Sequence, residues 1–189
     1  MNYEIWSLHD IIIQSDSNTI EGLRSDLLTF VCEKDVDVQN FLHTKSVYFD
    51  KKDKTRTYLI VDNTSGSVNI LGYFSIAIKV LTVPEDLSGS KKKKLDGKYS
   101  NIENGISAYL IGQLGKNDIY KDRITGRQIL LEAFNIIKEA QSRVGGRVVY
   151  IECCDTPQLI KFYEQNGFTL FNRDPKSGLM QMLTYINKV

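Results

Sequence analysis

The segment from residue 126 to residue 144 constrains the fold of this chain most strongly. Its apolar residues recur every three or four positions, which predicts a helix with one apolar stripe. Gly145 and Gly146 follow and are expected to end that helix. Runs rich in β-forming residues stand on both sides, at 106–114 and 147–153. The strongest predicted helix therefore lies between two predicted strands.

The rest of the chain also mixes strands and helices. Asp16 or Ser17 is the expected cap of the first helix, and Thr156 with Pro157 begins the last one. Hairpins are expected at both ends of the chain, and this order predicts an α/β (α+β) fold, a mixed sheet with helices on both faces. The further strands are predicted at 3–8, 57–62, 68–81, 168–173 and 179–185, and the further helices at 18–31, 37–49 and 157–166.

Composition limits the class of protein. The chain has 189 residues, of which 42% are hydrophobic and 25% charged, as in a globular domain. The formal net charge is +1, so any attraction to nucleic acid or membrane must come from a local patch. Residues 82–105 form a polar excursion with four consecutive lysines, Lys91–Lys94. These lysines are read as a solvated loop, as a contact to nucleic-acid phosphates, or as a contact to a cofactor phosphate.

Cysteine and histidine usage excludes two common kinds of site. Three cysteines without a Cys-x-x-Cys pair, and two histidines, predict neither a disulfide framework nor a structural metal. Cys153 and Cys154 are interpreted first as buried residues at a strand end and second as nucleophiles. The first residues do not resemble a signal peptide, and we expect no membrane-spanning segment. A reduced, cytoplasmic protein is the resulting expectation.

Two segments carry candidate chemistry. The sequence Arg123-Ile-Thr-Gly126-Arg-Gln128 opens the strong helix, where backbone amides and the helix dipole favour a phosphate or pyrophosphate. An ordinary glycine-containing cap is the alternative, since neither the Walker nor the Gly-x-Gly-x-x-Gly spacing is present. Further on, Phe162-Tyr163 leads to Asn166-Gly167-Phe168. Tyr163 is either part of a packed aromatic pair or a proton donor whose hydroxyl reaches a cleft.

Together these segments resemble the GNAT superfamily of acetyl-CoA-dependent N-acetyltransferases. In that family a strand, an anion loop and a long helix precede a Phe-Tyr-x-x-x-Gly-Phe segment, in the order found here. The resemblance implies a single N-acetyltransferase domain over residues 1–189, with a mostly antiparallel central sheet. Acetyl-CoA is then the co-substrate, without a metal, and a homodimer is among the expected assemblies.

The first half of the chain is similar to the toxin-type branch of that superfamily. The similar segments are Phe30–Leu42, Thr55–Val61, Gly72–Ala77 and Leu110–Gly115. Members of this branch acetylate the amino group of aminoacyl-tRNA and pair with an antitoxin, so both are expected partners. This chain differs from the branch at Gln113, Lys116 and Asn117, and from the pyrophosphate loop of the superfamily at Gln128.

The resemblance assigns roles to particular residues. Tyr163 would protonate the departing thiolate, and main-chain groups of Leu114 and Gly115 would hold the pantetheine arm and the acetyl carbonyl. No general base is identified, because Gln113 cannot accept a proton at neutral pH. His43 is one candidate, although a lone histidine on an amphipathic helix is more often structural or at the surface. Other acceptors, a small amine or a protein N-terminus, stay open, as does a CoA-binding domain without turnover. The expected pyrophosphate loop comprises Arg123, Ile124, Thr125, Gly126, Arg127, Gln128 and Ile129.

Overall fold

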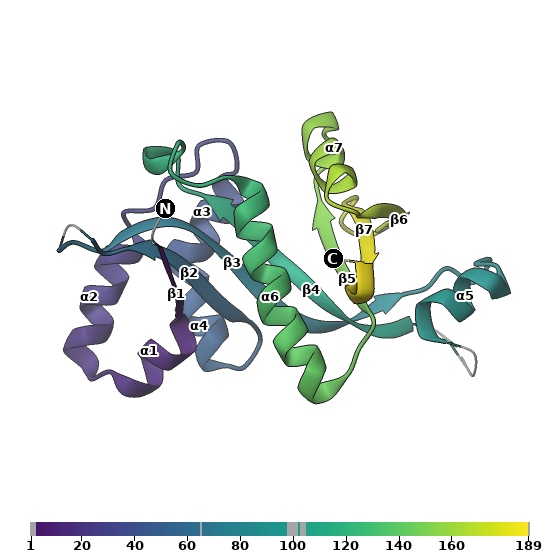
Figure 1. Cartoon of the computed structure of the whole chain (residues 1–189), viewed down its shortest axis with the longest axis horizontal. Helices are drawn as coiled ribbons and strands as arrows, with labels where there is room; N and C mark the ends of the chain where they lie inside the picture. The colour runs from purple at the N-terminus through teal and green to yellow at the C-terminus, as the bar shows by residue number, and fades with distance from the viewer. Residues whose placement is uncertain (1–2, 65, 98–101, 103–104, 189) are drawn as a thin grey trace. The chain divides into compact units, whose positions relative to one another are not determined.

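The structure is a computed structural model that describes residues 3–64, 66–97, 102 and 105–188. Its chain divides into two compact units. The first unit comprises Met1–Ala77 and Gly112–Ala133, and the second comprises Ile78–Ile111 and Phe134–Val189. Two strands and the longest helix therefore contribute residues to both units, and each unit is described in turn below (Figure 1).

The first unit contains a three-stranded antiparallel arrangement with short helices. Leu59 pairs with Tyr73, and Thr57 pairs with Ser75. Leu59 and Tyr73 belong to a buried apolar cluster that also receives side chains from the helices. The elements that begin in this unit are β1 (Glu4–Ser7), α1 (Leu8–Gln14), α2 (Ser17–Leu27), α3 (Val36–Asn40), η1 (Phe41–Lys45), α4 (Ser46–Lys51), β2 (Arg56–Asp62), β3 (Asn69–Thr82), η2 (Asp118–Tyr120) and α6 (Gly126–Val144).

Helices cover both faces of β3 in the first unit. A Cβ built on Gly72 would meet the Ile129 side chain of α6, which places α6 on one face. The next residue, Tyr73, faces the other way and donates its hydroxyl hydrogen to the Val38 carbonyl of α3 at 2.5 Å. The predicted helices on both faces are therefore present around this strand.

The second unit is built on a hairpin and a parallel pair. β4 pairs in parallel with β5 from Tyr109 to Ile111, and β7 pairs antiparallel with both β5 and β6. Its core joins α5 to this sheet through Leu95, which packs with Leu110 and Tyr150. The elements that begin in this unit are α5 (Gly89–Asp96), β4 (Gly105–Lys116), β5 (Val148–Cys153), α7 (Pro157–Gln165), β6 (Thr169–Arg173), β7 (Met180–Tyr185) and η3 (Ile186–Lys188).

The order of the hydrogen-bonded strands is β1-β2-β3-β4-β5-β7-β6 over the described part of the chain. The pair β4–β5 is parallel, whereas β1–β2, β2–β3, β5–β7 and β6–β7 are antiparallel. The predicted mixed, mostly antiparallel sheet is thus confirmed. Helix α6 has the predicted bounds, but Val144 at its end is 69% exposed and is not part of the buried stripe.

Three local features differ from the sequence-based expectation. Helix α1 follows β1 at once, and Ser7 caps it by accepting a hydrogen bond from the Asp10 amide. The helix predicted at 37–49 is interrupted by the π-helical turn η1, within which Phe41 and Leu42 are both buried. The polar excursion 82–105 contains helix α5, while its residues 98–101 and 103–104 lie outside the described residues.

Candidate anion-binding loop and catalytic tyrosine

The carboxyl-terminal end of β4 packs tightly in the first unit. A Cβ at Gly115 would stand 2.6 Å from Val38 Cγ1 and 2.9 Å from Tyr73 Cε1. A Cβ at Gly72 would stand 2.9 Å from the carbonyl oxygen of Gly115. Both positions therefore favour glycine, because a Cβ at Gly72 would press on the β4 backbone and a Cβ at Gly115 would press on packed side chains. Leu114 and Gly115, which the sequence analysis assigned to cofactor contact, lie in this packed segment.

Asn117 fixes the connection that follows β4. Its side chain is fully buried and donates from Nδ2 to the Ile70 carbonyl at 2.8 Å. Its Oδ1 accepts from the amides of Val31 and Ile119, and its own amide donates to Leu71. Removing such a buried amide would leave several backbone groups without partners. From the sequence, Asn117 stood out only as a difference from the toxin-type branch, and nothing in the residue pattern indicated this anchor.

Arg123 has a protein partner in this loop. Its Nη2 lies 2.6 Å from Oδ2 of Asp62, a carboxylate at the end of β2 that is 2% exposed. The Thr64 hydroxyl and amide, and then Arg123, hold the pKa of Asp62 below its usual range. Arg123 therefore balances a buried negative charge near the loop instead of standing as an unpaired cation.

The first turn of α6 is a capping box. The Gln128 amide donates to Thr125 Oγ1 at 3.2 Å, and the Thr125 amide donates to Gln128 Oε1 at 2.9 Å. The helical ladder begins with the Ile129 amide, which donates to the Thr125 carbonyl. The backbone amides of Gly126 and Arg127 take no part in the capping box, so these two N–H groups of the first turn are the donors that the box does not use. The Thr-x-x-Gln spacing could have revealed this cap from the sequence.

Tyr163 lies in α7, in the second unit. Its side chain is 8% exposed, and its ring makes edge contacts with Phe162 and Phe168 at 5.0 and 5.5 Å between ring centroids. Phe168 in turn stacks on Phe134 of α6. The carbonyl of Tyr163 accepts from the Phe168 amide across Gly167, whose φ of +86° turns the chain after the helix. The aromatic packing expected for this segment is present and fixes the ring.

The cysteines and histidines have structural settings. Cys153 is buried, and burial raises the pKa of its thiol to about 11, so the thiol stays protonated at neutral pH. Cys154 is exposed, which corrects the expectation that it is buried; it follows the last residue of β5 and has left the sheet. The ring of His43 lies 2.8 Å from the Phe30 carbonyl through Nε2.

The structure brings most predicted site residues into one unit. Leu114, Gly115 and the loop 123–129 all belong to the first unit, whereas Tyr163 belongs to the second. Among the described residues there is no group of three or more His, Cys, Asp or Glu side chains that could hold a metal ion. The helices described here include none with the length and hydropathy needed to cross a membrane.

Comparison with known proteins identifies the fold. No protein-family model matches the chain. A structure of AtaT complexed with acetyl-methionyl-tRNAfMet is similar with a TM-score of 0.70 at 20% identity, covering 95% of this chain and 94% of that one. AtaTR bound with acetyl-CoA is similar with a TM-score of 0.72 at 20% identity, over 99% and 95% of the two chains. A mutant of KacT is similar with a TM-score of 0.72 at 16% identity, covering 100% of this chain and 97% of that one. The chain thus has, along its length, the GNAT-like fold of these proteins.

Proposed function

We propose that this protein is an acetyl-CoA-dependent N-acetyltransferase that acetylates the amino group of an aminoacyl-tRNA in the cytoplasm. The observation that carries the proposal is the shared fold, over 95% of this chain, with a protein solved in complex with acetyl-methionyl-tRNAfMet. Similar structures also contain acetyl-CoA and an antitoxin, which supports the same co-substrate and an antitoxin partner here.

The start of α6 suits the pyrophosphate of acetyl-CoA. Two first-turn amides, those of Gly126 and Arg127, remain outside the capping box at the positive end of a 19-residue helix. Arg127 is exposed and supplies a cation. Arg123 serves indirectly, because it neutralises Asp62, whose charge would otherwise repel the pyrophosphate. The residues present therefore fit this anion.

The end of β4 supplies backbone groups for the thioester. Its parallel ladder to β5 covers Tyr109–Ile111, although the strand itself runs to Lys116. In our proposal the main-chain groups of Leu114 and Gly115 bind the pantetheine arm, and an amide there polarises the acetyl carbonyl. The packing at Gly72 and Gly115 and the anchor at Asn117 hold this backbone in a fixed position.

Direct attack by the amine completes the proposed reaction. A neutral amine attacks the acetyl carbonyl, the C–S bond breaks, and the hydroxyl of Tyr163 protonates the departing thiolate of CoA. The proton that the nitrogen loses passes to water, and a proton from water restores the Tyr163 hydroxyl. Cys153 is not needed as a nucleophile, and its raised pKa argues against that role. The buried Oε1 of Gln113 has no hydrogen-bond partner among the described residues, and we assign it to an N–H of the incoming amine.

Acetyl-CoA should stabilise the protein against thermal unfolding. At about 100 times its dissociation constant, a ligand that binds only the folded state contributes roughly 2.7 kcal/mol. Gly126→Glu should abolish this stabilisation, because it places a side chain and a negative charge at the start of α6, where the negatively charged pyrophosphate is proposed to bind. Gly22→Glu is the matched control, since a Cβ at Gly22 meets nothing within 4 Å. If acetyl-CoA stabilises both variants equally, the loop does not bind its pyrophosphate.

Gln128→Ala should strengthen acetyl-CoA binding while weakening the free protein. The substitution removes the acceptor of the Thr125 amide and so frees that donor for the pyrophosphate. One net hydrogen bond corresponds to about 0.5–1.5 kcal/mol, or a change in Kd of about twofold to tenfold. Isothermal titration checks the affinity, with Gln158→Ala at the exposed start of α7 as the control. Weaker binding by Gln128→Ala would instead make Gln128 a ligand of the cofactor.

A further inference from the structure

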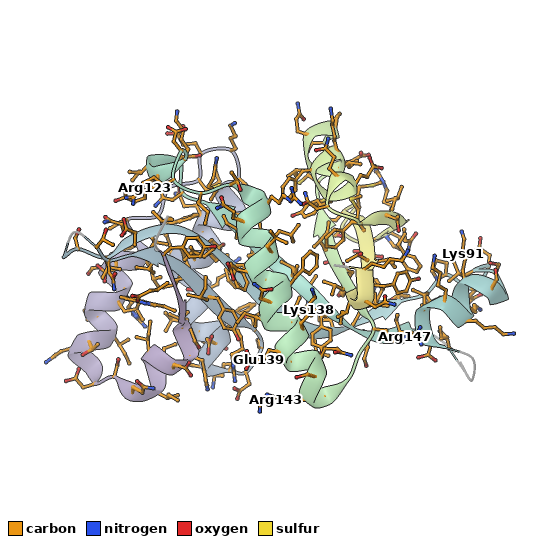
Figure 2. All side chains as sticks on the ribbon, in the orientation of Figure 1. Lys91, Arg123, Lys138, Glu139, Arg143 and Arg147 are labelled. Carbon is orange, nitrogen blue, oxygen red and sulfur yellow. The ribbon has the colours of Figure 1, made fainter. Side chains whose placement is uncertain are left out.

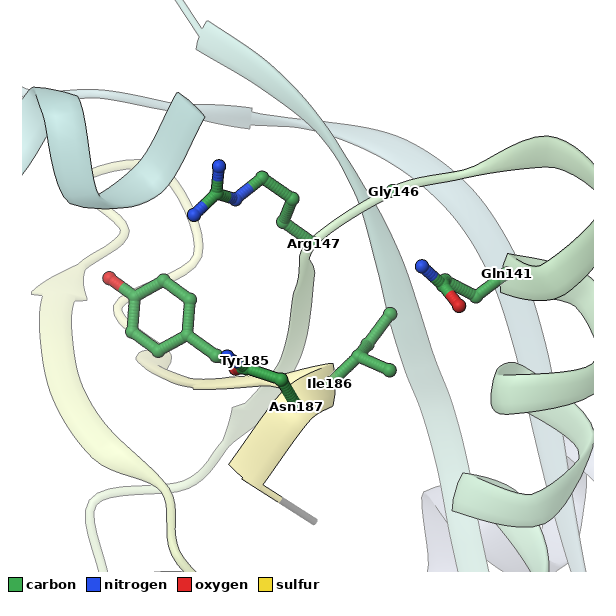
Figure 3. A pocket seen from close by; sticks show the side chains of 6 residues that line it. All are labelled: Gln141, Gly146, Arg147, Tyr185, Ile186 and Asn187. Carbon is green, nitrogen blue, oxygen red and sulfur yellow. The ribbon is translucent and has the colours of Figure 1, made fainter. Parts of the chain in front are cut away.

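A pocket in the second unit lies outside all the residues assigned above. It has a volume of about 280 Å³ and is lined by Gln141, Gly146, Arg147, Tyr185, Ile186 and Asn187 (Figure 3). Arg147 directly precedes β5 and Tyr185 ends β7; these two strands pair, and the Ile186 amide donates to the Arg147 carbonyl at 3.0 Å. Three side chains that line it, those of Gln141, Arg147 and Asn187, carry N–H donors.

Three cations gather at this pocket. The Nζ atoms of Lys94 and Lys188 lie 5.4 and 5.9 Å from the centroid of the Tyr185 ring. Burial raises the pKa of the Tyr185 phenol, and the nearby positive charge of Arg147 opposes that rise. Helix α5, the turn before β5 and the turn η3 therefore bring positive charge to the Tyr185 ring of β7, from residues far apart in sequence.

The position of Arg147 depends on a glycine. A Cβ on Gly97 would stand 3.0 Å from Nη1 of Arg147, and Gly97 has a φ of +103°. Gly97 thus ends α5 in a conformation that side chains disfavour and leaves space for the guanidinium. Arg147 is held against the end of α5, even though it belongs to an exposed turn before β5.

These charges lack a counterpart in the described part of the chain. No ion pair of Lys94, Arg147 or Lys188 with a carboxylate occurs among those residues, whereas Glu139 of α6 already pairs with Arg143 at 3.8 Å. Asp96, on the last turn of α5, is the acidic residue close to Lys94 in sequence, but no ion pair between it and these three cations occurs among the described residues. Cations brought together without carboxylates repel one another, and a bound anion would offset that cost.

The basic surface formed by the α5 lysines with Arg147 and Lys188 extends over a greater length than one phosphate group. Helix α5 has eight residues and so extends about 12 Å. Its exposed lysines include Lys91, which is labelled in Figure 2, and Lys93. In a DNA duplex the phosphates of one strand lie about 3.4 Å apart along the axis. Lys91–Lys94 extend over about 4.5 Å of the helix axis, so these lysines alone cover more than one such spacing. A polymer with regularly spaced phosphates matches this surface better than a single small anion.

We propose that Lys94, Arg147 and Lys188, together with the other lysines of α5, bind successive phosphates of an RNA backbone. This inference rests on the proposed function, because the RNA is then the tRNA body of the aminoacyl-tRNA. From the sequence alone, Lys91–Lys94 remained open between a solvated loop, a contact to nucleic-acid phosphates and a contact to a cofactor phosphate. The convergence of Lys94 with Arg147 and Lys188 selects the phosphate contact.

The test measures binding of deacylated tRNA, without acetyl-CoA, as a function of salt concentration. The slope of log Kobs against log salt is negative, and each lost phosphate contact lowers its magnitude, to which all values below refer, by about 0.7–0.9. Arg147→Gln combined with Lys188→Gln should lower the slope by about 1.5, and replacing Lys91–Lys94 by serine should lower it further. The matched control changes two exposed lysines of the same unit, Lys161→Gln and Lys176→Gln, and should keep the wild-type slope.

Each outcome decides the inference separately from the proposed function. An unchanged slope in the Arg147/Lys188 variant overturns it, even if the enzyme acetylates aminoacyl-tRNA. The inference is also overturned if inorganic pyrophosphate binds at the pocket but the variants leave the affinity for tRNA unchanged. The pocket would then be a site for a small anion. A lowered slope in a protein that transfers no acetyl group supports the RNA surface and contradicts only the proposed function. With active enzyme, the variants should raise KM for the tRNA and leave kcat unchanged.

Discussion

Tyr163→Phe is expected to lower kcat for acetyl transfer about 10²–10⁴-fold, the usual effect of losing a general acid. The substitution keeps the ring that packs on Phe162 and Phe168 and removes the hydroxyl alone. Affinity for acetyl-CoA should therefore stay close to that of the wild type, and the loss should appear in kcat. Single-turnover assays with labelled acetyl-CoA measure the transfer step directly.

The matched control for this experiment is Tyr109→Phe. Tyr109 is also buried, and its hydroxyl donates to the Gly145 carbonyl at 2.6 Å. Losing that bond should lower the free energy of unfolding by about 1 kcal/mol without changing kcat. Full turnover by Tyr163→Phe would make Tyr163 a packing residue, and the proposed mechanism would then need another proton donor.

Asp50→Ala should destabilise the protein by about 3–5 kcal/mol, the cost of breaking a buried charge pair from one side. Asp50 is fully buried in α4; its Oδ2 accepts from the Thr57 amide at 3.2 Å. Its Oδ1 lies 3.0 Å from Nδ1 of His9 and 3.4 Å from Nη1 of Arg56. The carboxylate thus joins α1, α4 and β2. Urea unfolding gives the change in the free energy of unfolding.

Asp53→Asn is the control for Asp50. Asp53 also pairs with Arg56, at 2.7 Å, but its side chain is 77% exposed. An exposed pair contributes about 0–1 kcal/mol, and asparagine tolerates the φ of 54° at this position. The destabilisation by Asp50→Asn should lie between those of Asp50→Ala and Asp53→Asn, because asparagine keeps one hydrogen-bond acceptor but loses the charge. Equal destabilisation by Asp50→Ala and Asp53→Asn would show that the buried carboxylate is not an anchor.

Local patterns were enough to predict much of this fold. The apolar stripe from Ile129 to Ile137 and the glycines after Val144 predict a helix with the bounds that α6 has in the structure. Pro157 and Gly167 likewise bracket helix α7. Such signals lie within a few residues of the element that they define, so one sequence suffices to recognise them.

The features that the sequence did not reveal depend on contacts between distant residues. Asn117 reads as a loop residue until it meets Ile70 and Val31, and Arg123 reads as an unpaired cation until it meets Asp62. The cluster at Tyr185 joins residues 94, 147 and 188 in the same way. Pairing across such separations is decided by tertiary packing, which residue periodicity does not encode.

The central claim, acetyl transfer to an aminoacyl-tRNA, is tested most directly by labelled acetyl-CoA and mass spectrometry. Wild-type protein is incubated with charged tRNA, deacylated tRNA and a panel of small amines and peptides. The account predicts label on the α-amino group of the aminoacyl-tRNA and none on the deacylated tRNA. Label on a small amine or a peptide N-terminus instead, or no label at all while acetyl-CoA still stabilises the fold, would contradict it.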